Sequence, residues 1–235
     1  MTELTYGFKM FEKAPYETPD SKALTEAIFE GIKEEEKIYG PYLIATFIKY
    51  VLRGVSRLTG EQPPEDIKTL NQLLEYIFSK ANILPVPLHF LVLWAQFVTD
   101  KKFEGSLAVG TQLMYKGIMK RAAKSEGDLE LQNCDVDKIL AKLRQLAVLF
   151  KVAPLEFGYR KNPDGTLDII HGGCFYFEGC KMSLGQNLLT RPDGRMACGT
   201  SVSVCQFLKM GTKYEWDYTV LEFTKPRCTV RCFMI

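Results

Sequence analysis

The segment LEFGYRKNPDGTLDII, residues 155–170, marks the point where the predicted fold of this chain changes. Two short runs rich in apolar and aromatic residues, Leu155–Tyr159 and Leu167–Ile170, lie on either side of the turn sequence Asn162-Pro163-Asp164-Gly165. Such runs around an Asp-Gly turn are typical of a β-hairpin. The hairpin separates a helical first part of the chain from a β-rich last part.

Upstream of the hairpin, apolar residues recur with the period of amphipathic helices. Asp20 or Ser21 can cap the first helix, Gly40-Pro41 ends it, and Asp135 can cap the last one. A linker at 60–64 contains two consecutive prolines. The predicted helices contain residues 24–37, 43–58, 65–78, 89–98, 103–124 and 135–150.

Downstream of the hairpin, the pattern indicates more β-structure. Residues 183–194 are predicted to form a polar loop and 198–210 a short helix, and 214–223 and 229–235 are predicted to be two closing strands. Helices followed by an antiparallel sheet with an inserted helix define the α+β class.

Composition narrows the functional classes. The chain has 235 residues, of which 46% are hydrophobic and 25% charged, as in ordinary globular proteins. A net charge of +2 without a dense Lys/Arg run argues against nucleic-acid binding. The longest apolar run, Ile83–Val98, is shorter than the ~20 residues that span a bilayer, so no membrane span is expected. The odd number of cysteines, seven, and the lack of a signal peptide favour a reducing, cytoplasmic location.

Six of the seven cysteines occur from residue 174 onward, which makes a metal site one candidate. Cys198, Glu222, Cys228 and Cys232 could hold zinc tetrahedrally. Residues four apart on an unbroken strand lie ~13 Å from each other, so this site requires a turn at 226–229 that folds Cys228 back. The alternative is that these thiols are small apolar groups of a core.

Two further candidates involve histidine and aromatic residues. His171-Gly172-Gly173-Cys174 could pair an imidazole with a thiol to form a nucleophile, or could simply be a turn at a strand end. Trp94, Phe103 and Trp216, with His171 and Cys174, could line a pocket for an apolar ligand. Aromatic residues at helical or strand spacing are otherwise ordinary core residues.

The order of elements from residue 103 to 235 resembles the vinyl-reductase-type, hydrocarbon-binding domain family, which is shared with subunits of vesicle-tethering complexes. The resemblance is carried by a cysteine that opens a short helix (Cys198-Gly199), a glutamate in a strand (Val220-Leu221-Glu222) and a closing Cys232-Phe233-Met234-Ile235. In phenol-sensing members, the corresponding cysteines and glutamate bind zinc beside an aromatic-ligand pocket. Cys228 would serve as the middle cysteine, although it follows the glutamate at a greater distance than in the family.

The resemblance implies a ligand-binding α+β domain at 103–235. It does not extend to residues 1–102, whose apolar periodicity predicts a helical N-terminal region. The expected function is to hold a small, largely apolar molecule between helices and sheet, with a structural zinc. One alternative is a thiol-dependent enzyme acting on a small-ring or thioester substrate, with Cys174 or Cys198 as nucleophile. Another is a scaffold or assembly subunit that binds a second copy or a protein partner through the apolar segment 83–98.

Overall fold

The chain forms an α+β fold, as the sequence predicts. The structure, a computed structural model, describes residues 7–11, 13–18, 20–126, 131 and 133–235, with the backbone alone for 120–126. Within these residues there are eight helices and one antiparallel sheet. The helices are α1 (Ser21–Tyr39), α2 (Pro41–Thr59), α3 (Leu70–Ser79), α4 (Leu88–Asp100), α5 (Ser106–Glu126), α6 (Val136–Leu149), α7 (Phe177–Gly185) and α8 (Gly199–Thr212). The strands are β1 (Lys9–Met10), β2 (Glu156–Lys161), β3 (Leu167–Gly172), β4 (Trp216–Phe223) and β5 (Arg227–Met234).

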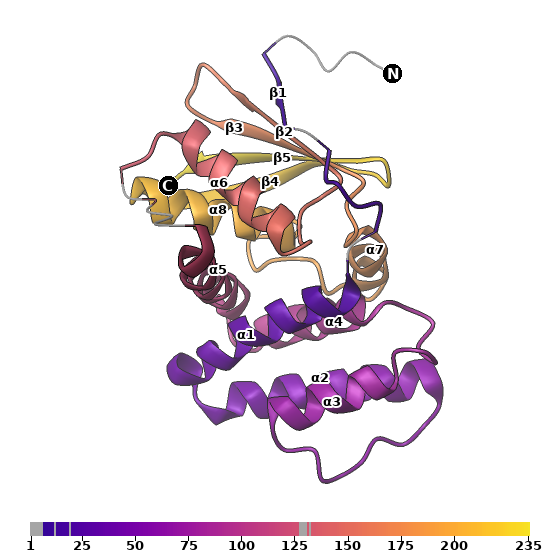
Figure 1. The fold of residues 1–235 in the computed structure, drawn as a ribbon. Helices are drawn as coiled ribbons and strands as arrows, with labels where there is room; N and C mark the ends of the chain where they lie inside the picture. Colours follow the sequence, from indigo (N-terminus) through magenta and orange to yellow (C-terminus); the bar gives the residue numbers. More distant parts are fainter. Residues whose placement is uncertain (1–6, 12, 19, 127–130, 132) are drawn as a thin grey trace.

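The elements are arranged in layers (Figure 1). Helices α6 and α8 lie next to the sheet, α5 packs against α8 and α1, and α2 and α3 are farthest from the sheet. The buried apolar side chains form two main clusters, one built largely from residues 28–95 and the other from 93–232. Helix α4 contributes to both, because Leu93 belongs to the second cluster and Leu91 and Val92 to the first.

Helix ends follow the capping signals of the sequence. In the first turn of α1, the Asp20 carboxylate accepts hydrogen bonds from the backbone amides of Lys22 and Ala23. In the first turn of α6, the Asp135 carboxylate accepts one from the amide of Lys138. The prediction was wrong for α3, which begins at Leu70 because Thr69 and Gln72 form a capping box there. Residues 61–69 are therefore not helical, and part of this segment runs beside α2.

The five strands pair in the order β1-β2-β3-β5-β4. The predicted hairpin is β2 and β3, whose register is continuous from Glu156–Gly172 to Lys161–Leu167. The sequence predicts one helix between the hairpin and the closing strands, whereas the structure has two, α7 and α8. The nine-residue α7 has glycines at 179 and 185, which weaken its helical signal.

Side chains of the central strands alternate between an inner face that packs on the helices and an outer face. On the outer face, the Asp168 carboxylate is only 2% exposed and accepts hydrogen bonds from Arg160 Nη2 at 2.6 Å and Arg231 Nε at 2.7 Å. Burial alone would raise the pKa of Asp168, but the hydrogen bonds from the two arginines lower it to about 2. Ionic pairing therefore holds β2, β3 and β5 in register on this face.

Helix α4 is buried inside the chain. Nine of its 13 residues are buried, and it packs against α1, α2, α5 and α7. The apolar segment 83–98, predicted as a candidate partner surface, is thus largely covered by the chain's own helices. None of the described helices is long and apolar enough to cross a membrane.

Helices α1 and α5 approach each other closely at two glycines. A Cβ atom on Gly31 would lie 2.6 Å from the backbone oxygen of Gly110, and one on Gly110 would overlap the Glu35 carboxylate. This contact buries Glu35, which is 3% exposed. Burial, with a smaller contribution from the nearby Asp100 carboxylate, raises the pKa of Glu35 from 4.5 to about 8.

The Glu35→Gln variant is expected to be more stable than the wild type at neutral pH. Since the folded-state pKa lies above the unfolded value, Glu35 reduces stability progressively as pH rises from 4.5 to about 8. Urea unfolding should show a gain of about 3 kcal/mol at pH 7 and little gain at pH 4.5. Glu36→Gln, an exposed neighbour on α1, is the control. An equal effect of Glu35→Gln at both pH values would contradict this account.

Candidate functional site

The four predicted zinc ligands do not converge. Strand β5 is unbroken from Arg227 to Met234, so Cys228 and Cys232 are ~13 Å apart on its inner face. A bulge between Val220 and Glu222 shifts β4, and the Glu222 carboxylate accepts hydrogen bonds from Arg227 Nε at 2.9 Å and Thr229 Oγ1 at 3.1 Å on the outer face.

The turn at 226–229 that the predicted site required is not formed, because β5 already pairs with β3 at Arg227 and Cys228. Across the part of the chain that the structure describes, no three His, Cys, Asp or Glu side chains are grouped so that they could hold a metal ion. Zinc binding stays a prediction, and it would require these elements to rearrange.

The thiols nevertheless gather beneath the inner face of the sheet. Cys174, Cys180 and Cys228 each interact electrostatically with Cys198, the residue before α8. A second contact joins α8 to β5, where the sulfurs of Cys205 and Cys232 are 3.8 Å apart. Six cysteines from four segments of the chain thus lie within one buried region.

The pKa values of several of these thiols are raised, which favours their protonated form. Burial, with a contribution from neighbouring thiols, raises the pKa of Cys174 to about 12 and that of Cys228 to about 11. Burial also raises the pKa of Cys198, although hydrogen bonds from Ser201 and Thr200 oppose it. Nucleophilic cysteines have lowered pKa values, so this arrangement does not favour a thiolate at neutral pH.

His171 lies on the inner face of β3, opposite Cys228 and Phe157 in the neighbouring strands. It is 1% exposed, and neither ring nitrogen has a hydrogen-bond partner within the described residues. Burial lowers the pKa of His171 to about 4, which makes the ring neutral. The imidazole is therefore not paired with the Cys174 thiol, although the two lie only three residues apart.

The predicted aromatic pocket is divided between different parts of the core. Trp94 is buried in the cluster of α1–α4 and Phe103 packs against that cluster, whereas Trp216 belongs to the cluster under the sheet. Trp94 Nε1 donates a hydrogen bond to the Gln186 side chain, and Trp216 Nε1 donates one to the Thr212 side chain.

His171 and Trp216 pair with opposite ends of β5, at Cys228 and Met234, which places them about 20 Å apart. The structure therefore separates His171 from Trp216 and divides the three aromatic residues between two clusters.

The space where α1, α4, α5 and α8 meet is almost filled. A cavity there has a volume of about 40 Å³, and a second cavity, between α1, α2, α4 and α5, has a volume of about 10 Å³. Gln96 and Leu107 line both. Cavities of this size hold water molecules, not an organic ligand. A ligand between helices and sheet would have to push these helices apart.

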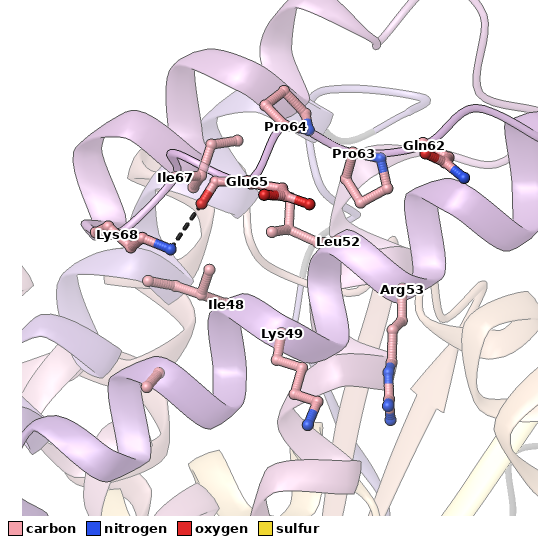
Figure 2. Close-up of a pocket in the computed structure, with 11 residues that line it drawn as sticks. Ile48, Lys49, Leu52, Arg53, Gln62, Pro63, Pro64, Glu65, Ile67 and Lys68 are labelled. Atoms are coloured by element: carbon pink, nitrogen blue, oxygen red, sulfur yellow. Dashed lines mark hydrogen bonds between the residues drawn. The ribbon is translucent and has the colours of Figure 1, made fainter.

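A larger hollow lies on the other side of the helical layer, between α2 and the segment 61–68. This groove has a volume of about 650 Å³. Its lining residues are Ala45, Ile48, Lys49, Leu52, Arg53, Gln62, Pro63, Pro64, Glu65, Ile67 and Lys68. In Figure 2, Ile48 and Leu52 point toward the segment that carries Pro64 and Ile67.

The sequence prediction missed this groove. The sequence predicts an amphipathic helix over residues 43–58 and a linker at 60–64. The signal that could have revealed it is Pro63-Pro64, which prevents a helix from continuing through a segment close to an apolar helix. The segment is irregular, with a turn at Glu65-Asp66, and the surface between it and α2 remains open.

Comparison with protein families, curated proteins and solved structures found no match to this chain.

The thiols are expected to react slowly with iodoacetamide in the native protein at neutral pH. Burial raises the pKa values of Cys174, Cys180, Cys198 and Cys228, so little thiolate is present to attack the reagent. Mass spectrometry of labelled peptides over time, with urea-unfolded protein as the control, measures the protection. A single rapidly labelled cysteine among these four would contradict this account and favour the thiol-dependent enzyme.

Proposed function

We propose that this protein binds a small, largely apolar molecule, and that the groove between α2 and the segment 61–68 is its site. The observation that carries the proposal is the combination of size and lining. A volume of about 650 Å³ lies within the 300–1,000 Å³ typical of small-molecule sites. Its floor is built from the side chains of Ile48, Leu52 and Ile67 with two prolines.

The floor residues of the groove pack against the hydrophobic core. Ile48 and Ile67 are buried and belong to the hydrophobic cluster of α1–α4, and Leu52 packs against that cluster. On the opposite wall, Lys68 Nζ donates a hydrogen bond to the Glu65 backbone oxygen at 2.6 Å. A preformed apolar surface lets a ligand bind without the cost of ordering the site.

The two alternatives from the sequence have less structural support. A thiol-dependent enzyme needs an activated thiolate, and desolvation raises the pKa values of the half-buried candidate thiols Cys174 and Cys198. A scaffold acting through the segment 83–98 needs that segment to be accessible, and α4 is mostly buried. The ligand-binding role therefore fits the geometry best.

Leu52→Glu is expected to weaken the binding of the uncharged apolar dye Nile red at least tenfold. The half-buried Leu52 contributes to the groove floor, and a carboxylate there would have to be desolvated by an apolar ligand. Fluorescence titration of the purified protein measures the affinity.

The matched control is Leu58→Glu, the same change at a half-buried leucine of α2 that does not line the groove. Circular dichroism on both variants tests whether they remain folded. If the wild type does not bind Nile red, or if both variants weaken it equally, the groove is not the site.

A further inference from the structure

We infer that the groove takes an amphipathic anion, a molecule with an apolar tail and a carboxylate head such as a fatty acid. This inference rests on the proposed function and adds the chemical class of the ligand. Its basis is the charge of the lining, which carries three cationic side chains, Lys49, Arg53 and Lys68, against one carboxylate, Glu65.

These three cations are not neutralised by the protein. No ion pair joins any residue that the structure describes to Lys49, Arg53 or Lys68, although many other Lys and Arg side chains form one. The Arg53 guanidinium lies over the ring of Tyr50 at 5.9 Å. Unpaired cations beside an apolar surface leave a positive potential that an anionic ligand head would satisfy.

The positions of the charges agree with an amphipathic ligand. Figure 2 shows Lys49 and Arg53 extending from α2 away from the segment 61–68, while Ile48 and Leu52 point toward it. The charged heads therefore stand at the rim and leave the floor apolar, as long cationic side chains commonly do. A tail in the groove would place a carboxylate head at this rim, within reach of flexible lysine and arginine side chains.

The same charges select against other amphipathic molecules. A cationic head at this rim would meet the like charges of Lys49 and Arg53, which opposes its binding, and a neutral head would gain nothing from them. Because the rim is exposed to solvent, each charge contributes modestly, and added salt should reduce the preference.

The test is displacement of Nile red by dodecanoate, dodecanol and dodecyltrimethylammonium, each below the concentration at which it forms micelles. Dodecanoate should bind about three- to tenfold more tightly than dodecanol, and the cation more weakly than either. The Lys49→Glu/Arg53→Glu double variant should lose the preference for dodecanoate. Arg57→Glu, the next cation along the same face of α2 but outside the groove, should retain it.

The outcomes separate this inference from the proposed function. Equal binding of dodecanoate and dodecanol would overturn the inference and leave an apolar-ligand site in place. If the double variant and Arg57→Glu reduce the preference for dodecanoate equally, the preference comes from the overall charge of the protein. This result would also overturn the inference. Failure of all three compounds to displace the dye would remove the proposed function itself. If Leu52→Glu instead converts a dimer to a monomer in sedimentation, a second copy covers the groove and the inference is wrong.

Discussion

The close packing of α1 on α5 is the constraint on which the arrangement of this chain depends. Gly31 and Gly110 allow the two helix backbones to meet, since any side chain at either position would collide with its neighbour. The contact joins the α1–α4 layer to the part that carries the sheet. It also encloses the Glu35 carboxyl group, whose pKa burial raises to about 8. Helix α2 follows α1 directly through Gly40, so the position of the groove is linked to this contact.

Strand register explains why a region so rich in thiols does not form the predicted metal site. Alternation along β5 places Cys228 and Cys232 on the inner face and Arg227, Thr229 and Arg231 on the outer face. The Glu222 carboxylate pairs with this outer set because the bulge in β4 changes its register. The inner face is left with neutral thiols and the neutral ring of His171, which pack as small core groups.

Much of the fold could be predicted from local signals, because capping residues and turns act over a few positions. The Asp20 and Asp135 caps and the Asn162–Gly165 turn lie where the sequence predicts them. Properties that depend on tertiary packing could not be read in the same way. The side of the sheet that Glu222 occupies depends on one bulge, and the groove depends on how the segment 61–68 packs beside α2. Neither has a periodic pattern in the sequence.

The most direct test of this account is a backbone amide NMR titration of the full chain with dodecanoate. Binding in the groove should cause saturable shifts concentrated in residues 45–53 and 62–68 and leave the amides of β3, β5 and α8 nearly unchanged. Shifts concentrated instead around Cys174, Cys198 and the cavity lined by Gln96 and Leu107 would contradict it, because the ligand would then lie between the helices and the sheet.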